Sequence, residues 1–511
     1  MRADSKVAIP DMRGQAGRRP YNATDLGNAE RFVEQHGNVV RHVSNTSCWH
    51  IWDGTRWAVD RDGQRRRRAM DTARSIYDEA ARANHESERK DLARHAVLSE
   101  SRRSIDAMIE LAKDLAPIAT VPEAFDSAET DYLLNVENGT LDLRTGELRR
   151  HNPADAITKL APVELIPGAR SSVWDAFLEQ QVPDAETRAF LARAAGYTLT
   201  ANTGEEVLFL VHGPTAAGKS TLAEALKSML GDYALTCGFE TFLRRRGDAG
   251  VRDDLARLAG ARMILASEPG EGRALDEAVL KSMTGGDTVS ARHLYQRHFE
   301  FQPAAKLWLL TNHRPRANAQ DDAVWRRVML VPFERTVPVD ERDPTVKARL
   351  MHDPDVRRAI LAWAVAGCLE WQRTGLKPPA AVVAATLNYR DENDSVGKFL
   401  ADEFSTPPRS VSPRELRDRY TKWCEANGER PLPPNQLGAA LRQHGLVDGK
   451  SGSVRAWRFP ERQQGQHGQQ FRVTPLRSAS REEFAETAAI GVPAAPACRT
   501  PKDVRIGADH E

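Results

Sequence analysis

One segment of the chain has the residue types and the spacing of a phosphate-binding loop. Residues 213–221 read Gly-Pro-Thr-Ala-Ala-Gly-Lys-Ser-Thr, between an apolar run at 207–211 and a helix-like run that ends near residue 230. The two glycines allow a tight turn and a close approach of the backbone to an anion. Amides at the start of the following helix then point at the phosphates. The residues predicted to contact a nucleotide are Gly213, Pro214, Thr215, Ala216, Ala217, Gly218, Lys219, Ser220 and Thr221.

Within this loop, a cation and a hydroxyl have separate predicted roles. Lys219 supplies a positive charge for the β- and γ-phosphates, and Ser220 supplies a hydroxyl ligand for Mg²⁺. A chance match in an ordinary loop is the alternative, and the flanking strand and helix argue against it. The sequence therefore predicts that the chain binds ATP together with Mg²⁺.

Two further apolar runs each end in a polar residue that could act on a bound nucleotide. The first run ends at Glu268, whose carboxylate can hold Mg²⁺ or orient the attacking water, and Glu271 could share that work. The second run, 306–311, ends at Asn312, which can reach the γ-phosphate or the water. The alternatives are a solvated acid at a strand end and, for Asn312, an ordinary turn residue.

Between these runs, residues 290–301 predict two strands around a basic and aromatic tip. Arg292, Arg297 and His298 are candidates for contacts with a nucleic-acid backbone, and Tyr295 offers a stacking surface. An ordinary surface hairpin is the alternative.

A pair of arginines, Arg326 and Arg327, comes directly before the last apolar run at 328–331. Adjacent side chains on a helical turn point in different directions. One arginine could therefore pair within its own subunit while the other reaches the γ-phosphate held by a neighbour. A purely structural ion pair is the alternative.

Composition bounds the class of protein more than it identifies the function. The 511 residues suffice for about three domains. Lys and Arg number 72 against 71 Asp and Glu, so the net charge of +1 points neither to nucleic acid nor to a membrane. The arginine clusters at 65–68 and 244–246 are either solvated faces or phosphate contacts.

Cysteine spacing and apolar runs favour a soluble protein of the cytoplasm, in a bacterium or a phage-infected host. The five cysteines lie far apart without a Cys-x-x-Cys pair, which argues against a zinc ribbon and against a disulfide framework. Residues 1–14 lack the apolar segment of a signal peptide. The longest apolar run, 359–369, is shorter than the roughly 20 residues of a membrane helix, so no membrane partner is expected.

The pattern of apolar residues predicts an α/β protein with flanking domains. Near-continuous apolar runs at 207–211, 263–266, 307–310 and 328–331 are typical of strands buried on both faces of a largely parallel sheet. Around 49–57 and 133–148 the pattern indicates hairpins, and 65–115 and 173–199 are predicted helical. The expected domains are a mobile 1–20, an α+β domain at 21–165, the α/β domain at 170–390, a compact segment at 395–462 and a disordered tail at 463–511.

The compact segment near the carboxyl terminus reads as a small winged helix. Ser412-Pro413-Arg414-Glu415 has the composition of a helix start, a second helix is expected from Asn435, and 453–459 resembles a wing. Such a unit could contact duplex DNA. The alternative is a helical cap packed on the α/β core.

Taken together, these motifs resemble the superfamily-3 helicases. More closely, residues 30–460 are similar to the phage and plasmid primase-helicase family, which includes the poxvirus primase-helicase. The resemblance rests on the loop at 213–221, the run 264–268, Thr284-Gly-Gly-Asp287, Thr311-Asn312-His313 and Trp325-Arg-Arg327. Trp52-Asp-Gly-Thr-Arg-Trp57 and Asn138-Gly-Thr-Leu-Asp-Leu143 resemble the domain that precedes the motor in that family.

The resemblance implies a fold and an assembly. The fold would be an AAA+-like P-loop NTPase core, and members of the family form rings, usually hexamers, with ATP between subunits. Carried over by position, Glu268 is the acidic residue of the second motif, Asn312 is the sensor, and Arg327 is preferred over Arg326 as the finger supplied in trans. Arg297 and His298 would form the pore tip that tracks single-stranded DNA, usually 3′ to 5′; some members carry Lys-His where this chain has Arg-His.

The leading hypothesis is an ATP-dependent DNA helicase acting in the replication of a phage or mobile element, on single-stranded and forked DNA. One alternative is a bifunctional primase-helicase with a primase in residues 21–165. No zinc motif and no acidic primase triad can be identified there, which leaves a role for a separate primase as a partner. The other alternative is a nucleotide-switched DNA-binding initiator, in which ATP only assembles the ring.

Overall fold

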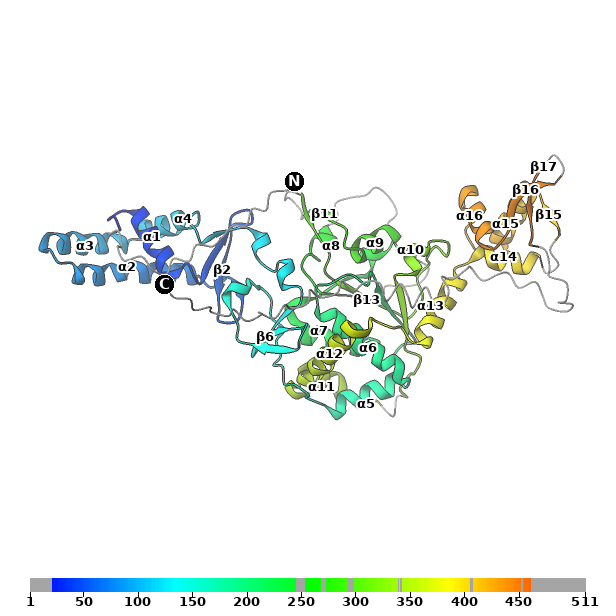
Figure 1. Ribbon diagram of the computed structural model, residues 1–511, viewed down its shortest axis with the longest axis horizontal. Helices are drawn as coiled ribbons and strands as arrows, with labels where there is room; N and C mark the ends of the chain where they lie inside the picture. The colour runs from blue at the N-terminus through cyan, green and yellow to red at the C-terminus, as the bar shows by residue number, and fades with distance from the viewer. Residues whose placement is uncertain are drawn as a thin grey trace, which may run out of the picture. The chain divides into compact units, whose positions relative to one another are not determined.

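The computed structural model describes residues 21–244, 253–267, 273–292, 298–338, 340, 342–404, 408–451 and 454–460 (Figure 1). Its contacts divide the chain into two compact units. The first comprises Met1–Thr130 with His151–Lys159, and the second comprises Asp131–Arg150 with Leu160–Glu511. No helix among the described residues is long and apolar enough to cross a membrane.

The first unit packs a helical group against a small sheet. The hairpin predicted around 49–57 is confirmed, and the strand order is β3-β2-β1-β4, with β4 parallel to β1. The predicted helical stretch at 65–115 consists of three helices. The elements are α1 (Asp25–His36), β1 (Val40–Val43), β2 (Cys48–Trp52), β3 (Trp57–Val59), α2 (Gln64–Arg82), α3 (Glu86–Ser99), α4 (Arg102–Ala112) and β4 (Ala119–Thr120), with short 3₁₀ turns η1 (Pro122–Ala124), η2 (Ala128–Thr130) and η3 (Pro153–Asp155).

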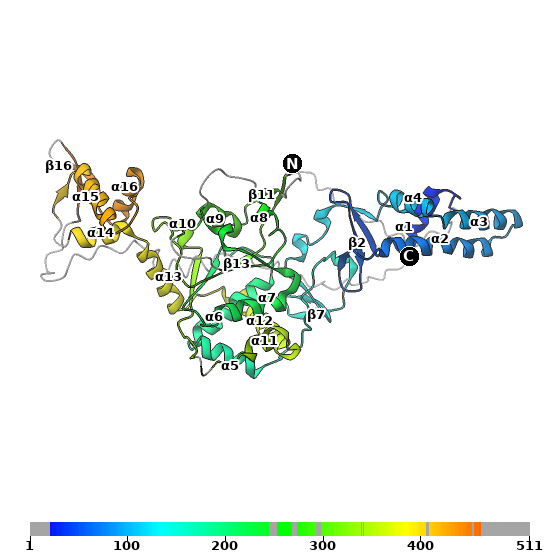
Figure 2. The ribbon, with the colours of Figure 1, turned by 180° about the vertical axis from the view of Figure 1, so that it is seen from behind.

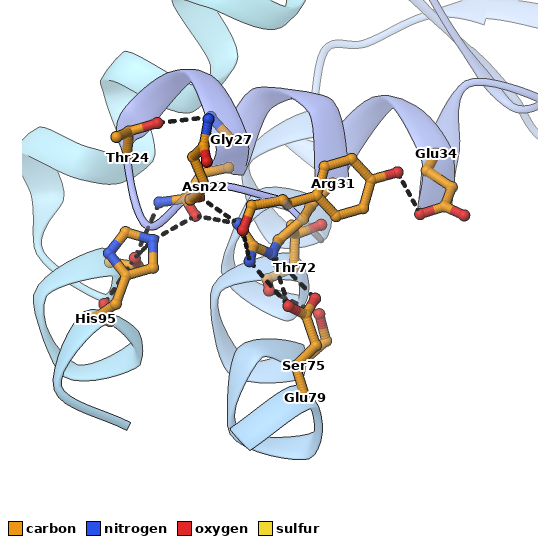
Figure 3. A network of polar contacts seen from close by, with 12 residues as sticks. Asn22, Thr24, Gly27, Arg31, Glu34, Thr72, Ser75, Glu79 and His95 are labelled. Carbon is orange, nitrogen blue, oxygen red and sulfur yellow. Dashed lines mark hydrogen bonds and ion pairs between the residues drawn. The ribbon is translucent and has the colours of Figure 1, made fainter. Parts of the chain in front are cut away.

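Polar contacts connect α1 to α2 and α3 (Figure 3). The buried Arg31 donates to both carboxylate oxygens of Glu79, with Nη2 2.9 Å from Oε2. Three residues before Arg31 on α1, Oδ1 of Asn28 lies 2.9 Å from His95 Nε2. Burial, and then the charge of Arg31, lowers the pKa of His95. This network holds the helices together because a buried guanidinium without its carboxylate partner would be costly.

The arginine cluster at 65–68 forms ion pairs within the first unit. Arg65 lies 2.8 Å from Asp60, Arg67 lies 2.7 Å from Asp62, and Arg66 pairs with Asp106. Of the two interpretations of this cluster, the geometry favours a solvated and paired face, because these charges are already partly neutralised.

The second unit contains a five-stranded parallel sheet in the order β14-β8-β13-β10-β9. The four apolar runs predicted to be its strands are confirmed. The fifth strand, β9, occupies one edge and was not predicted. The strands are β8 (Leu208–His212), β9 (Ala234–Gly238), β10 (Met263–Ser267), β13 (Lys306–Thr311) and β14 (Val328–Pro332).

Helices cover both faces of this sheet, so successive strand residues contribute to different cores. Phe209 and Trp308 face one core, to which α5, α6, α7 and α12 contribute. Leu210 and Leu307 face the other core, with residues of α8, α9, α10 and α13. The helices are α5 (Ser172–Gln181), α6 (Ala185–Leu199), α7 (Lys219–Leu230), α8 (Asp253–Ala256), α9 (Glu277–Thr284), α10 (Asp322–Trp325), α11 (Thr345–His352), α12 (Pro354–Thr374) and α13 (Ala380–Glu392), with 3₁₀ turns η4 (Gly231–Tyr233) and η5 (Phe239–Phe242). This mixed α/β architecture agrees with the predicted fold class at that level.

Two details of the helices follow from single residues. The stretch 173–199 forms α5 and α6 rather than one helix, because Pro183 lacks an amide hydrogen and the Asp184 side chain caps α6. Helices α6 and α12 approach closely at Gly196, where a Cβ atom would lie 2.0 Å from the Cys368 nitrogen.

Residues 131–150 form a small antiparallel sheet of β5 (Leu133–Val136), β6 (Gly139–Asp142) and β7 (Glu147–Arg149). Both hairpin turns predicted at 133–148 are confirmed. This sheet groups with the second unit, unlike the domain expected at 21–165. The reason is local: buried Arg262 donates to the carbonyl oxygens of Leu133 and Leu199, at 2.8 and 2.6 Å.

The carboxyl-terminal part of the second unit, which contains α14, α15 and α16 (Figure 2), has its own hydrophobic core. The Ser412 side chain caps a helix by accepting from the Glu415 amide at 3.2 Å, as the sequence predicted. A three-stranded antiparallel sheet has the order β15-β17-β16. The elements are α14 (Ser395–Glu403), β15 (Ser410–Val411), α15 (Pro413–Ala426), α16 (Pro434–Gln443), β16 (Val447–Ser451) and β17 (Val454–Arg458).

Candidate functional site

The glycine-rich loop at 213–218 connects β8 to α7. Ala216 and Gly218 adopt positive φ angles of 62° and 81°. Gly213 lies so close to β14 that a Cβ atom there would be 1.8 Å from the Phe333 carbonyl oxygen. Only glycine tolerates such an approach, so the loop conformation depends on the residue type that the motif requires.

Lys219 contacts both the loop and a second predicted site residue. Its side chain is 6% exposed. The Nζ atom donates to the carbonyl oxygens of Gly213 and Pro214 at 2.6 and 2.7 Å, and to Oδ1 of Asn312 at 2.8 Å. The structure therefore brings together Lys219 and Asn312, which are 93 residues apart in the chain.

The amino end of α7 is suited to an anion. Its first residue is Lys219, no side chain caps it, and its first turn contains no acidic residue. Among the neighbouring helices, α5 is capped by Ser171, α6 by Asp184 and α9 by Asp276. Uncapped amides at a helix start provide positive partial charge and hydrogen-bond donors. The loop residues thus fit a phosphate group, and the exposed Ser220 hydroxyl lies in the first turn.

The carboxyl ends of three adjacent strands converge at this edge of the sheet. Strand β13 lies between β8 and β10, so Asn312 and the end of β10 lie beside the loop. The last described residue of β10 is the exposed Ser267. Glu268, the predicted metal and water ligand, lies outside the described residues, as does Glu271.

The predicted hairpin is confirmed at its base. Strand β11 (Val289–Arg292) pairs with β12 (His298–Phe301), and Arg292 is opposite His298. Arg292 is half-buried, and its Nε atom has no hydrogen-bond partner among the described residues. Arg297 and the side chain of His298 lie outside the described part of the hairpin.

The two arginines before β14 have different surroundings. Arg327 is 9% exposed in its side chain, lies 2.5 Å from the Glu206 carboxylate and donates to the Ala323 carbonyl at 2.8 Å. Arg326 is 54% exposed and lies 3.7 Å from the same carboxylate. Burial lowers the pKa of Arg327, and Glu206 opposes that shift. The geometry thus gives Arg327 the internal ion pair and leaves Arg326 at the surface.

The arginine pair and the glycine-rich loop lie at opposite ends of the same strands. Strand β14 is parallel to β8, with Val328 opposite Leu208, and the Leu208 amide donates to the Arg327 carbonyl at 2.8 Å. The loop begins at the other end of β8. Five residues of a parallel strand span roughly 16 Å, so the arginine pair lies at about that distance from the loop of its own subunit.

Glu206 is a site residue that the sequence analysis did not predict. It holds both arginines and has a positive φ of 51°, which is uncommon for a residue with a side chain. It belongs to a polar turn before β8, and nothing in that local sequence distinguishes it from an ordinary solvated acid. Its partners lie about 120 residues away, so only the tertiary structure shows its role.

The arginine pair is also connected to the helix that precedes the hairpin. Lys281 on α9 lies 2.5 Å from Asp321, whose side chain caps α10 by accepting from the Ala323 amide at 3.1 Å. At the end of α9, a Cβ atom on Gly285 would lie 3.4 Å from Nη2 of Arg327. The carboxyl end of α9, which comes shortly before the first strand of the hairpin, therefore lies next to Arg327.

Comparison with family models gives two matches along the chain. Residues 29–183 match a family described as "D5 N terminal like". Residues 211–327, which include the glycine-rich loop, Asn312 and the arginine pair, match a family of unknown function, DUF5906.

Curated relatives come from large DNA viruses. A protein named "Putative helicase" of Acanthamoeba polyphaga mimivirus is 26% identical over 62% of this chain, and one of Frog virus 3 is 27% identical over 68%. A protein named "Putative primase" of African swine fever virus is 22% identical over 58%. The chain covers 35%, 44% and 33% of these relatives, so it spans less than half of their length.

Among solved structures, apo forms of the C-terminal region of NrS-1 match at TM-scores of 0.45 and 0.44, with 9% and 11% identity. These matches cover 86% of this chain and 100% of the other. The family and relative matches confirm the resemblance drawn from the motifs. Residues 29–183 thus match the D5 N terminal-like family, and the chain is similar to proteins named as helicases and primases of large DNA viruses.

Proposed function

We propose that this protein is an ATP-dependent DNA helicase acting in viral, phage or mobile-element DNA replication. The observation that carries the proposal is the separation of the glycine-rich loop from the arginine pair at opposite ends of β8 and β14. If an arginine at that place contacts a nucleotide, the nucleotide is one held by a neighbouring subunit, because the loop of its own subunit lies at the far end of the strands. The proposal therefore includes a ring of identical subunits, expected to be a hexamer.

The proposed nucleotide site consists of the loop and the residues beside it. The amides of 213–221 would bind the phosphates of ATP, Lys219 would turn from the loop carbonyls to them, and Ser220 and Glu268 would hold Mg²⁺. Bound Mg²⁺ neutralises charge on the phosphates and favours attack by water. Asn312, already hydrogen-bonded to Lys219, would orient that water or the γ-phosphate.

The finger assignment changes with the geometry. Arg327, the residue preferred as the finger from the sequence, contacts Glu206 and Ala323 within its own subunit. We assign the trans contact to the exposed Arg326 and a positioning role to Arg327. Glu206 neutralises both arginines until the phosphate of a nucleotide bound to a neighbouring subunit competes for Arg326.

The DNA arm uses the hairpin of β11 and β12. Arg292, Arg297 and His298 would contact the phosphates of single-stranded DNA, and the connection through α9 would couple that contact to the arginine pair. The P-loop core would be of the AAA+-like superfamily-3 type. The elements α15, α16, β16 and β17 would form a winged helix that contacts the duplex at a fork.

A second candidate function is a bifunctional primase-helicase, because one set of relatives bears the name primase. Under that alternative the protein would synthesise primers on a single-stranded template with Mg²⁺. Under the leading proposal, no primer forms unless a separate primase is added. An assay of primer synthesis by the purified protein therefore distinguishes the two functions.

Steady-state ATP hydrolysis, with and without single-stranded DNA, tests the leading proposal. We expect DNA to stimulate turnover, and Lys219→Ala to abolish both basal and stimulated hydrolysis. Hydrolysis that is indifferent to DNA would indicate another class of ATPase. If the wild type binds ATP and DNA but does not hydrolyse ATP, the protein is a nucleotide-switched initiator instead.

A further inference from the structure

A cleft of about 1160 Å³ lies beside the segment that follows β13. One wall comes from 273–277 and 314–320 of the α/β core. The other comes from 392–395 and from 429–436, the segment between α15 and α16. None of the residues proposed above to bind nucleotide or to form the hairpin lines it.

Five arginines and three acids line this cleft. Arg244 lies 3.6 Å from Glu277, and Arg314 pairs with Glu392. The remaining acid is Glu429. The lining therefore carries more positive than negative charge, although the whole chain is close to neutral. Such a local excess of cations concentrates a polyanion at the cleft.

The other three arginines are available to a ligand. The side chains of Arg273, Arg316 and Arg430 are exposed, and they form no ion pair or hydrogen bond with the described residues. Arg273 and Arg316 are fixed next to each other, because the Arg316 amide donates to the Arg273 carbonyl at 2.9 Å. Arg430 comes from the opposite wall. Three exposed arginines from three chain segments thus line one cleft.

Asn318, Gln320, Asn393 and Gln436, which have amide side chains, also line the cleft. Guanidinium and amide groups are common donors to phosphate oxygens, and contacts to phosphate carry no direct base-sequence information. Arg314, which lines the cleft, follows Asn312 by two residues in the chain. A ligand there could influence the sensor residue through a very short segment.

We propose that this cleft binds the phosphate backbone of DNA as a second contact surface, separate from the hairpin. The inference rests on the proposed function, because both require a protein that moves along DNA. Phosphate contacts by Arg273, Arg316 and Arg430 hold a strand between the α/β core and the carboxyl-terminal helices. Single-stranded and duplex DNA share this backbone chemistry, and the experiment separates them.

The test replaces all three arginines, Arg273, Arg316 and Arg430, by Gln in the full chain. Fluorescence anisotropy with a labelled single strand and a labelled duplex gives Kd at several salt concentrations. Log affinity falls linearly with log salt, and each lost phosphate contact reduces the steepness of that fall by about 0.7 for a single strand and about 0.9 for a duplex. For the probe that occupies the cleft, we expect the slope to become shallower by about 2 to 3. We also expect binding at 100 mM salt to be at least about tenfold weaker.

Two further variants make the result specific. Replacing Arg74, Arg94 and Arg102 by Gln removes the same charge from exposed positions of the first unit, and should leave Kd and slope unchanged. Replacing the three cleft arginines by Lys keeps the charge and should restore most of the affinity and slope. Thermal unfolding of all variants checks that the fold is intact.

The outcomes separate the inference from the proposed function. Wild-type affinity and slope in the triple Gln variant, or an equal loss in the first-unit control, overturns the cleft as a DNA site. So does failure of the wild type to bind either probe. Failure of the helicase proposal shows instead as DNA-independent hydrolysis by the wild type. Basal hydrolysis without DNA should be the same in the wild type and in the triple Gln variant.

Discussion

The Nζ atom of Lys219 lies 2.8 Å from Oδ1 of Asn312 and also donates to two loop carbonyls. These contacts hold the lysine against the loop, with its side chain buried. A phosphate must replace the carbonyl contacts, whereas Asn312 can keep a polar group beside the lysine throughout. Under the proposed function the two residues would therefore have separable roles, binding for Lys219 and orientation for Asn312.

Replacing Asn312 by Ala should separate these roles. We expect kcat for ATP hydrolysis to fall by about 10² to 10³, as when one catalytic hydrogen-bonding group is removed. The Kd for a fluorescent ATP analogue should change only a few-fold, whereas Lys219→Ala should weaken it strongly. The same change at the exposed Asn427, at the end of α15, is the control. Equal loss of nucleotide affinity in both site variants would contradict the assignment.

Replacing each of the two arginines before β14 by Ala should have a different kind of effect. Arg326→Ala should lose turnover by about 10³ or more with unchanged thermal stability, because an exposed finger acts only across an interface. Arg327→Ala should lower the melting temperature as well, since it leaves Glu206 without its closest partner.

Subunit mixing provides the decisive control for the finger. Under the proposed function, Lys219→Ala and Arg326→Ala subunits should each be inactive alone, whereas a mixed ring would contain interfaces with an intact lysine and an intact arginine. Partial recovery of hydrolysis on mixing is expected. Recovery should be absent when both changes are in the same subunit. A mixture that stays inactive would argue against action in trans by Arg326.

The sequence predicted the strands that consist of continuous apolar runs. Strands β8, β10, β13 and β14 are buried on both faces, so each reads as an unbroken apolar stretch. Strand β9 was missed because it is an edge strand, whose residues after Ala234 alternate between half-buried and exposed positions and include Thr236 and Gly238. Its pattern resembles that of a surface loop.

The candidate site shows the same limit. Lys219 and Asn312 were predicted because each follows or ends a recognisable element. Glu206 was not, because its role exists only when β8 and β14 lie side by side. The choice between Arg326 and Arg327 likewise depends on which side chain is buried, and adjacent identical residues carry no such information in the sequence.

Replacing Gly213 by Ala should damage the loop without touching a nucleotide ligand side chain. The new Cβ atom would lie 1.8 Å from the Phe333 carbonyl oxygen, so the end of β14 or the loop must move. We expect a loss of about 1 to 3 kcal/mol in stability, as for other overpacked sites, together with weaker ATP binding. Calorimetry and analogue binding measure the two effects.

A second glycine provides a matched control for that substitution. At Gly438 in α16, a Cβ atom would meet only Trp457 and Arg442 at 3.7 Å or more. Gly438→Ala should therefore be neutral or stabilising by about 0.5 to 1 kcal/mol, because alanine favours the helix. If both changes have equal effects, the close approach at Phe333 is not what fixes the loop.

Glu205, the neighbour of Glu206, should make stability depend on pH. Its carboxylate accepts from Nε1 of Trp371 at 2.6 Å, and burial raises its pKa above 4.5. The folded protein then binds more protons than the unfolded chain in the range above pH 4.5, so this residue lowers stability as pH rises through that range. Glu205→Gln keeps an acceptor for Trp371 and removes the charge.

Melting temperatures of the wild type and Glu205→Gln between pH 4 and pH 8 test this prediction. We expect the variant to be more stable by a few degrees at pH 7, with the difference vanishing below pH 4.5. Glu425→Gln, at an exposed position of α15, should follow the wild-type curve. Parallel curves for Glu205→Gln and the wild type would mean that the carboxylate is solvated and contributes no pH dependence. The turn before β8, which also holds Glu206 against the arginines, would then owe its conformation to backbone contacts such as the bond from the Glu206 amide to the Thr203 carbonyl.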